Sequence, residues 1–594
     1  MTTDKKRLDG HRLALLSNRF EGIVRAMTNT LLRTARSTIL NTARDFSCCI
    51  LTADHEMLAM AESLPIHVMS GPDLMAKCMA DFFPTLRAGD AYLHNSPYHG
   101  NSHAADWTLL VPVVDSDGNH RFTVMAKAHL ADCGNAIPTT YSAGAKDVYE
   151  EGALIFPCVK VQEKYEDRED VLRIAKVRIR VPELWHGDFL ALLGAARIGE
   201  RKLLELIQEI DPDELEVYPH DWFNYSEKLM IAAIRKLPSK SVKNSGWHDP
   251  MREVLPDGIK IRTEVTVDAE NAKIHVDLTD NPDCQPCGLN LTEATARTAA
   301  MMGVFTGLGA VVPPNAGSFR RLSVTLRENC VVGIPKHPYS CSVATTNLSE
   351  LVANCVTRAI AELGDGYGMA ATGKASPAAT SVISGVAPGP MGGPFVNQMM
   401  LGFSGGAAGP SVDGWLTIMG IGAAGFLMRD SIEILEMKYP IYVERQHVIQ
   451  DSEGAGKFCG APGVHCEFGP LEGEFTAVWL SEGTTHPPIG VRGGDNGSLA
   501  EQYVRGTDDS LSRPLGTYEQ VSVKPGERVV SICTGGAGYG LPSERDPERV
   551  AGDVQRGWLS KQRARDKYRV VLSDSGTVDL AQTEAVRAKY KSAS

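Results

Sequence analysis

A histidine-rich stretch, His94-Asn-Ser-Pro-Tyr-His-Gly-Asn-Ser-His103-Ala-Ala-Asp106, is the most informative part of this sequence. Its Pro and Gly residues are typical of a loop, and loops held by a rigid scaffold often carry binding groups. A second histidine–carboxylate pair with the same spacing follows at His129-Leu-Ala-Asp132. The segment from His94 to His129 contains five of the 16 histidines of the chain. We therefore expect the functional site here.

The two histidine–carboxylate pairs favour a metal site. His103 and Asp106 are three residues apart, so a helical turn would point both side chains to one side. Residues Arg121–His129 alternate between apolar and more polar side chains, which predicts a strand ending at His129. Asp45 precedes another predicted strand, Phe46–Leu51, and strand ends at one sheet edge can converge. Imidazole and carboxylate donors without a thiolate suit zinc, manganese or iron. The alternative is that Asp45, His103, Asp106 and His129 are helix caps and hydrogen-bonded loop residues.

Other motifs in the chain are better explained by structure than by chemistry. Cys284-Gln-Pro-Cys287 lacks the second pair that a zinc ribbon needs. The stretch from Gly368 to Ala375 approaches a phosphate loop, but Ala375 lacks the hydroxyl that would bind magnesium. Gly420-Ile-Gly-Ala-Ala-Gly425 fits GxGxxG without a supporting βαβ pattern, so close backbone packing is the preferred interpretation. Gly402-Phe-Ser-Gly-Gly406 fits a hydrolase elbow, yet Gly and Pro follow where a helix should begin.

Size and charge narrow the class of protein. A chain of 594 residues with 43% hydrophobic and 22% charged residues is globular in composition. Its length suggests about three or four domain-sized units. The net charge of −12, without a basic stripe, argues against nucleic acids and anionic membranes as partners.

The cysteines and the N-terminal residues bear on the compartment. Thirteen scattered cysteines are typical of reduced thiols. The first ten residues include basic side chains but no apolar run, so we expect no secretory signal. No apolar run reaches the roughly 18 residues that a membrane span needs. We therefore expect a cytoplasmic protein.

Hydrophobic periodicity predicts the secondary structure along the chain. A helix-framed N-terminal half is followed by a half rich in Gly and short strands, so the predicted fold is α+β and multi-domain. Asp188 is available as the N-cap of one predicted helix. The predicted helices cover residues 11–37, 189–210, 224–237, 292–308, 348–363 and 547–567, and further strands cover 259–267, 273–278 and 322–326. The predicted regions are 1–250, which holds the metal site, a central α+β region 251–440, and a β-rich region 441–594 with a terminal helix.

Several segments together resemble the hydantoinase B/5-oxoprolinase family, nearly from end to end. Near the N-terminus the likeness lies in Arg44-Asp-Phe-Ser-Cys48, in Gly89–Asp106, and in Ala128-His-Leu-Ala-Asp-Cys-Gly134. In the C-terminal part it lies in Asp451–Gly460, in Pro487-Pro-Ile-Gly-Val-Arg-Gly-Gly494, and in the segment Gly535–Pro547. The family includes the large subunits of acetone and acetophenone carboxylases and of ATP-dependent lactamases.

The resemblance implies a divalent metal ion held by Asp45, His103, Asp106 and His129. It also implies that this chain does not bind ATP; a separate hydantoinase A-type subunit, with ATP and magnesium, would phosphorylate the substrate oxygen. Asp132 could orient His129 or act as a general base, and otherwise caps a turn. His67 and Glu151 become candidate catalytic residues only through the resemblance.

The sequence departs from the family pattern around the pocket, at Asn95–Ser96, Asn101–Ser102, Leu130 and Asn135. The sequence therefore does not identify which small carbonyl compound is the substrate. We expect an ATP-dependent cyclic amidohydrolase acting on a hydantoin, oxoproline or lactam. The alternatives are an ATP-dependent ketone carboxylase, with a possible small third subunit and bicarbonate as the second substrate, and a non-catalytic scaffold subunit.

Overall fold

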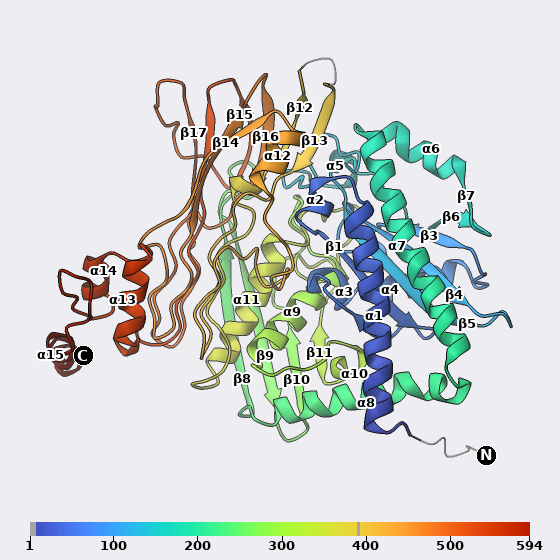
Figure 1. Ribbon diagram of the computed structural model, residues 1–594, viewed down its shortest axis with the longest axis horizontal. Helices are drawn as coiled ribbons and strands as arrows, with labels where there is room; N and C mark the ends of the chain where they lie inside the picture. The colour runs from blue at the N-terminus through green and yellow to red at the C-terminus, as the bar shows by residue number, and fades with distance from the viewer. Residues whose placement is uncertain (1–6, 389–391, 594) are drawn as a thin grey trace.

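The computed structural model describes residues 7–388 and 392–593. Residues 1–6, part of the segment assessed above for a secretory signal, lie outside the described residues. The predicted α+β, multi-domain architecture is confirmed: helices frame the N-terminal part, and several separate sheets follow one another along the chain (Figure 1). Within the described residues, no helix is long and apolar enough to cross a membrane.

The first sheet has seven antiparallel strands and carries the histidine-rich region. In the strand order β5 lies between β1 and β4. It pairs with β4 through a tight turn that joins the two strands, and its other side pairs with β1. In spatial order the strands are β2 (Met57–Met60), β1 (Phe46–Thr52), β5 (His120–His129), β4 (Asp106–Val114), β3 (Ala91–His94), β6 (Val159–Glu163) and β7 (Glu166–Asp167).

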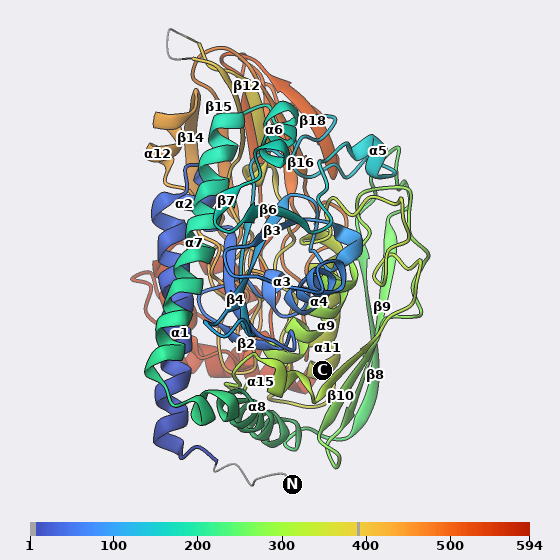
Figure 2. The same cartoon turned by 90° about the vertical axis from the view of Figure 1, so that its right-hand side faces the viewer.

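Helices cover both faces of this sheet. The long helices α1 (Gly10–Thr34) and α7 (Pro182–Glu209) lie side by side on one face (Figures 1 and 2). Apolar side chains of β1, β4 and β5 pack against them and form the main core. A second apolar cluster on the opposite face includes residues of α4 (Pro72–Phe82). The remaining helical elements of this part are α2 (Thr38–Asn41), α3 (Pro65–Val68), η1 (Pro97–His99), α5 (Val148–Glu151), α6 (Glu169–Arg178) and α8 (Pro212–Ile234).

A four-stranded sheet and two central helices follow. The strand order is β11-β10-β9-β8, with a parallel pair between β10 and β11. The elements are β8 (Lys240–His248), β9 (Ile259–Asp268), β10 (Lys273–Asp277), α9 (Glu293–Gly307), α10 (Ala316–Phe319), β11 (Leu322–Thr325) and α11 (Asn347–Ala361). Helices α9 and α11 lie between this sheet and the first one (Figure 2). Strand β8 pairs with β9 across the predicted region boundary at residue 250, and the division into three regions stays a prediction.

Two further antiparallel sheets form most of the C-terminal part. Their orders are β13-β12-β16-β18 and β14-β15-β19-β17. The strands are β12 (Val382–Val386), β13 (Pro394–Gln398), β14 (Ile441–Val448), β15 (Val464–Pro470), β16 (Phe475–Leu480), β17 (Glu501–Arg505), β18 (Tyr518–Val523) and β19 (Arg528–Ile532). The helical elements are η2 (Ala378–Thr380), α12 (Ile432–Lys438), η3 (Pro542–Glu544), α13 (Pro547–Gln555), α14 (Lys561–Asp566) and α15 (Leu580–Ala593).

The prediction for Asp188 was wrong. Helix α7 begins at Pro182, a residue whose fixed φ suits the first helical position, so Asp188 lies inside the helix. Its carboxylate instead accepts the backbone N–H groups of Arg36 at 2.6 Å and Ser37 at 3.2 Å, at the start of α2. The predicted helix 547–567 is two helices, α13 and α14, separated by a turn.

Candidate metal centre

Asp45, Asp106 and His129 lie at the same end of three neighbouring strands. His129 is the last residue of β5 and stands opposite Asp106, the first residue of β4. On the other side, the backbone N–H of His129 donates to the carbonyl of Asp45 at 3.0 Å, just before β1 begins. The antiparallel register therefore brings the three side chains together at one end of these strands, because residues that stand opposite each other point to the same face of the sheet.

His103 reaches the same point from a tight turn. The backbone N–H of Asp106 donates to the carbonyl of His103 at 3.2 Å, so the chain reverses just before β4 begins. Nε2 of His103 lies 2.9 Å from Oδ1 of Asp106. Nδ1 of His129 lies 3.2 Å from both of these atoms. The three side chains are almost completely buried, and their ligand atoms all lie within 4.8 Å of one another.

Hydrogen bonds on the far side of each ring indicate which nitrogen faces the cluster. Nδ1 of His103 lies 2.8 Å from the carbonyl oxygen of Ser342, which can only accept, so Nδ1 carries the hydrogen. Nε2 of His129 lies 3.1 Å from the hydroxyl of Thr140, which can accept its hydrogen. In their neutral form, both rings then present a nitrogen lone pair to the Asp106 carboxylate. This is the tautomer that a metal-ligating histidine requires.

The donor set fits a divalent ion. Two imidazole nitrogens and a carboxylate oxygen converge on one position, and all three are electron-pair donors. A single proton can bridge only one of these contacts at a time, whereas a divalent ion can be bound by all three. Asp45, the fourth predicted ligand, lies outside this group of three but lines the same small cavity as His129, where its carboxylate would be a further oxygen donor. The residues therefore suit zinc, manganese or iron, as the sequence predicted.

His67, on α3, is brought next to both carboxylates. Its Nε2 lies 3.3 Å from Oδ2 of Asp106 and 3.7 Å from Oδ1 of Asp45. The Ser47 hydroxyl lies 3.1 Å from its Nδ1 and already accepts the N–H of Leu64, so that hydroxyl is free to donate to the ring. His67 Nε2–H can then donate to Asp106 and hold this carboxylate in place.

The buried charges shift the acid–base properties of the cluster. Burial alone would raise the pKa of Asp106, but the rings of His103 and His67 hold this pKa well below its ordinary value. Burial raises the pKa of Asp45, and the neighbouring histidines offset only part of that effect. Asp106 therefore carries the firm negative charge of the cluster. A bound cation is favoured at this position because its positive charge compensates the buried carboxylate.

The structure does not bring Asp132 to the cluster. Its carboxylate accepts from the backbone N–H of Arg180 at 2.6 Å, from the Arg180 guanidinium at 3.1 Å, and from the N–H of Gly134 at 3.0 Å. Asp132 therefore forms an ion pair in a turn, and Thr140 is the partner of His129. The spacing of His129 and Asp132 equals that of His103 and Asp106, but Asp132 follows the end of β5, whereas Asp106 begins β4.

Glu151 is buried near the cluster without touching its ligand atoms. Ser340 donates its hydroxyl to Glu151 at 2.5 Å, and the same hydroxyl accepts the N–H of Ser342 at 3.3 Å. The carbonyl of Ser342 is the acceptor for His103 Nδ1–H. Glu151 therefore supports the segment that orients His103. Burial raises the pKa of Glu151, and the hydrogen bond from Ser340 offsets part of this shift.

Ser102 and Lys127 belong to the same surroundings and were not predicted. The Ser102 hydroxyl donates to Oδ2 of Asp106, and the Lys127 ammonium donates to Ser102 at 3.2 Å. Lys127 is 1% exposed, and burial lowers its pKa to about 8 although Asp106 counteracts this effect. Its position two residues before His129 on the same strand face was a usable signal.

We expect Thr140→Val to weaken metal binding and Asp132→Asn to leave it almost unchanged. Thr140→Val removes the acceptor that fixes the His129 ring, and such changes typically weaken metal binding about 10- to 100-fold. Asp132→Asn should leave metal affinity within about two-fold because Asp132 does not contact the ligand rings. Competition with a chelator of known affinity measures both. Equal losses of affinity in the two variants would contradict this assignment of partners.

A small cavity adjoins the candidate metal centre. Its volume is 30 Å³, and Asp45, His67, His129 and Tyr141 line the side nearest the cluster. The lining also includes apolar and small residues together with Glu350 of α11. The apolar lining comprises Leu64, Ile66, Met400, Met419, Ala423 and Leu427. The reactants of this centre would therefore meet acidic groups and imidazoles together with an apolar wall formed by these side chains.

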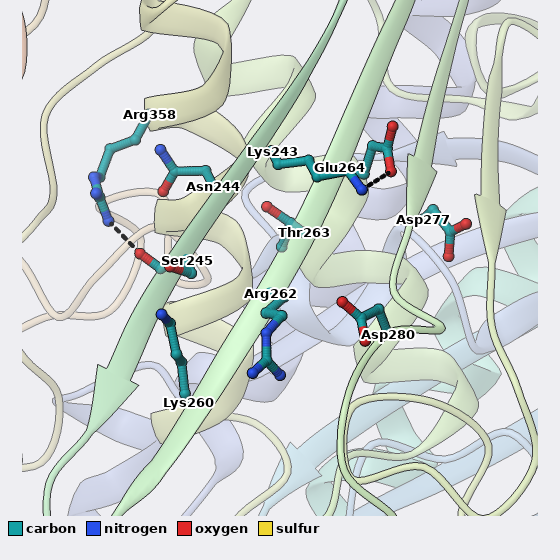
Figure 3. Close-up of a pocket in the computed structure, with 10 residues that line it drawn as sticks. All are labelled: Lys243, Asn244, Ser245, Lys260, Arg262, Thr263, Glu264, Asp277, Asp280 and Arg358. Carbon is teal, nitrogen blue, oxygen red and sulfur yellow. Dashed lines mark hydrogen bonds and ion pairs between the residues drawn. The ribbon is translucent and has the colours of Figure 1, made fainter.

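A more open cleft of 340 Å³ lies on β8 and β9 (Figure 3). Lys243 and Glu264 form a 3.4 Å ion pair there, and Arg358 donates to the carbonyl of Ser245 at 3.2 Å. Among the residues described, its lining contains no histidine or cysteine. It is therefore a polar surface cleft, distinct from the candidate metal centre.

Sequence comparison identifies the family of this chain. A sequence model of the family described as Hydantoinase B/oxoprolinase matches residues 9–542. The chain belongs to the hydantoinase B/oxoprolinase family. Among curated members, the beta subunit of the caprolactamase of Pseudomonas jessenii is 30% identical over 98% of this chain and 100% of its own length. The B-type subunit of the putative D-/L-hydantoinase of Pseudomonas sp. (strain NS671) is 28% identical over 98% and 99%.

Two solved structures of similar proteins extend this result. The ATP-dependent caprolactamase of Pseudomonas jessenii superposes with a TM-score of 0.87 at 28% identity and covers 98% of this chain and 100% of that chain. A nucleotide-free acetone carboxylase superposes with a TM-score of 0.84 at 17% identity and covers 98% and 83%. At that lower identity the second match shows a shared fold. The family and its fold, as expected from the sequence, are thereby confirmed.

Proposed function

We propose that this chain is the metal-bearing, B-type subunit of a heteromeric ATP-dependent enzyme that hydrolyses a cyclic amide. An A-type partner would bind ATP with magnesium and phosphorylate the carbonyl oxygen of the substrate. The full-length match to caprolactamase, in sequence and in structure, is the observation that carries the proposal. The buried cluster of His103, Asp106 and His129 supplies the chemistry that such an activity needs.

Each residue of the centre has a task in this reaction. Asp45, His103, Asp106 and His129 would hold a divalent ion, zinc or manganese before iron, and the ion supplies Lewis-acid activation of an oxygen atom. His67 holds Asp106 in position through its Nε2–H. The ring of Tyr141 lies 5.5 Å from that of His129 and covers this side of the centre against solvent. Exclusion of solvent strengthens every electrostatic contact in the site.

The charge of the cavity supports a neutral ring as the substrate. Two carboxylates, Asp45 and Glu350, face the cavity, and none of its described lining residues is a lysine or arginine. A substrate that carries its own carboxylate, such as 5-oxoproline, would find no lysine or arginine partner in this lining, and the metal ion would already be paired with the carboxylates that hold it. An uncharged lactam or hydantoin ring would meet the apolar wall instead. The present volume of 30 Å³ holds only roughly one or two water molecules, so a ring must displace Met400 and Met419, whose flexible side chains can repack.

Ketone carboxylation is the second candidate function. The acetone carboxylase structure favours it, because the two chains share a fold over 98% of this one. Such an enzyme would use bicarbonate and a small third subunit. Hydrolysis is preferred because the caprolactamase chain matches over its whole length at higher identity, whereas 83% of the acetone carboxylase chain is covered.

We expect the chain alone to bind no ATP and to convert no substrate, because it contains no complete phosphate-binding motif. After co-expression with an A-type subunit, the purified complex should consume ATP in the presence of lactams or hydantoins and release the ring-opened amino acid. The assay compares lactams, hydantoins, 5-oxoproline and ketones, with and without bicarbonate, and measures ADP and product.

Two results would overturn this proposal. Ketone-dependent turnover that requires bicarbonate and incorporates labelled carbon would favour the carboxylase. Tight nucleotide binding by the isolated chain in calorimetry would contradict the assigned division of labour between the subunits.

A further inference from the structure

A second chamber lies next to the cavity of the candidate metal centre. Its volume is 150 Å³, and its lining includes Trp247, Asn354, Lys374, Glu482 and His486. Lys374 and Glu482 form a buried ion pair, with exposed fractions of 12% and 1%, inside the chamber. Glu350 lines both this chamber and the metal-centre cavity. Glu350 therefore stands between the two spaces.

The carboxylate of Glu350 is held by backbone groups. The N–H groups of Ile421 and Gly422 donate to its two oxygens at 2.8 and 2.6 Å. A Cβ atom on Gly420 would lie 2.6 Å from the carboxylate, and one on Gly422 would lie 2.7 Å from Oε1. Gly420 and Gly422 of the GxGxxG stretch are thus required by close packing, as expected from the sequence, and their packing partner is this carboxylate.

The same contacts connect Glu350 to the metal centre. The carbonyl of Gly422 accepts the N–H of Ile66, the residue before His67, at 3.2 Å. Asn354, one turn further along α11, donates to the carbonyl of Glu350 at 2.8 Å and also lines the chamber. Arg358, a further turn along, lines both the chamber and the surface cleft of Figure 3. One face of α11 therefore runs from the metal-centre cavity, past the chamber, to the solvent-exposed cleft.

We propose that Glu350 is the acid–base residue that supplies a proton to the leaving ring nitrogen and recovers it from solvent through the chamber. The inference rests on the proposed amide hydrolysis. Water adds across the phosphorylated carbon–nitrogen bond. As the added hydroxyl loses its proton to solvent and re-forms the carbonyl, the carbon–nitrogen bond breaks, and the electron pair of that bond stays on nitrogen and takes the proton of the Glu350 carboxyl group. The acyl phosphate that remains is hydrolysed by a second water to the carboxylate and inorganic phosphate. Glu350 is left as a carboxylate, which is then reprotonated by water from the chamber side.

The surroundings of Glu350 suit this task. Burial raises its pKa to about 7, although the two backbone N–H groups act in the opposite direction, and the charge of Glu482 adds to the rise. Across the metal-centre cavity it faces Asp45, His67 and His129, and across the chamber it faces the Lys374–Glu482 pair, His486 and Arg358. An acid with a pKa near the working pH both donates and recovers a proton readily.

The test is Glu350→Gln in the complex with the A-type subunit. The rate of ring opening should fall about 100-fold or more, with bound metal and the far-ultraviolet circular dichroism spectrum unchanged. Wild-type kcat should decline as the pH rises through about 7 because the acid form is lost, and this limb should disappear in the variant. Glu362→Gln, at the C-terminal end of the same helix, is the matched control and should retain both rate and pH profile.

The result that overturns the inference is a Glu350→Gln complex with wild-type ring-opening rate and pH profile. If this variant does not fold, Glu350→Asp keeps the carboxyl group. That variant should retain the pH-dependent limb at a reduced rate, and its absence would also contradict the inference. A wild-type complex that opens no ring at all would instead contradict the proposed function.

Discussion

Replacing His103 by alanine is expected to remove the bound metal and to lower ring-opening activity by about three orders of magnitude or more, since Lewis-acid activation supplies several kcal/mol. His103 contributes one of the three converging ligand atoms, and its loss leaves only those of Asp106 and His129. Metal content is measured by elemental analysis of the purified complex, and activity by release of the ring-opened product.

The matched control for this variant is His99→Ala, four residues earlier in the same loop. Nδ1 of His99 is paired with the Ser96 hydroxyl at 2.8 Å, and its ring does not approach the cluster. We expect the control to retain its metal and its activity within about two-fold. Full metal occupancy and normal turnover in His103→Ala would show that the metal is held elsewhere, or that no metal is needed.

The second large effect concerns stability and centres on Arg545. Its side chain is 1% exposed and donates to both oxygens of Asp413, at 2.7 and 2.9 Å, and to Asp553 at 2.7 Å. Arg545→Met would leave two carboxylates without this partner, and breaking a buried ion pair typically costs about 3–5 kcal/mol. Hydrogen exchange of residues 546–570 should accelerate because this network attaches α13 to the glycine-rich segment around Asp413.

Arg549→Met provides the comparison. Arg549 also pairs with Asp413, but its side chain is 44% exposed, so the loss should be about 1 kcal/mol or less. Denaturant unfolding of both variants beside the wild type measures the difference. If the two substitutions destabilised the protein equally, the buried network would not be the main attachment of the C-terminal helices.

The elements that the sequence predicts best are those with strong local patterns. The strand at Phe46–Leu51 and the helix at 348–363 are found as β1 and α11, with ends within two residues. Helices that begin at or contain a proline start earlier than the pattern predicts. Pro182 is the first residue of α7, and Pro219 lies within α8. Proline usually indicates a break in a helix, so a sequence pattern places the starts of these two helices too late. Local pattern does not reveal which proline occupies a first turn.

The candidate site shows the same division between local and long-range information. The convergence of His103, Asp106 and His129 followed from spacing and strand alternation. The partners that orient the rings, Thr140 and the carbonyl of Ser342, carry no such signal; Ser342 is 239 positions away from His103. Asp132 had a suggestive spacing, but its backbone turns toward Arg180. The alternation of β5 suggested one polar face, yet Thr123 and Lys127 are buried because a second layer covers that side.

The register of β5 has a consequence for how the protein tolerates change. Because Asp106 stands opposite His129 and Asp45 shares a backbone hydrogen bond with it, three ligand candidates depend on one strand alignment. A slip of one residue would turn the His129 ring to the other face of the sheet and bring Ala128 or Leu130 to its place. Insertions within these strands would therefore abolish the centre at once. Part of the apolar cavity wall, Met400, Met419 and Leu427, lies outside these strands, so its side chains can change without shifting the strand alignment that places the ligand candidates.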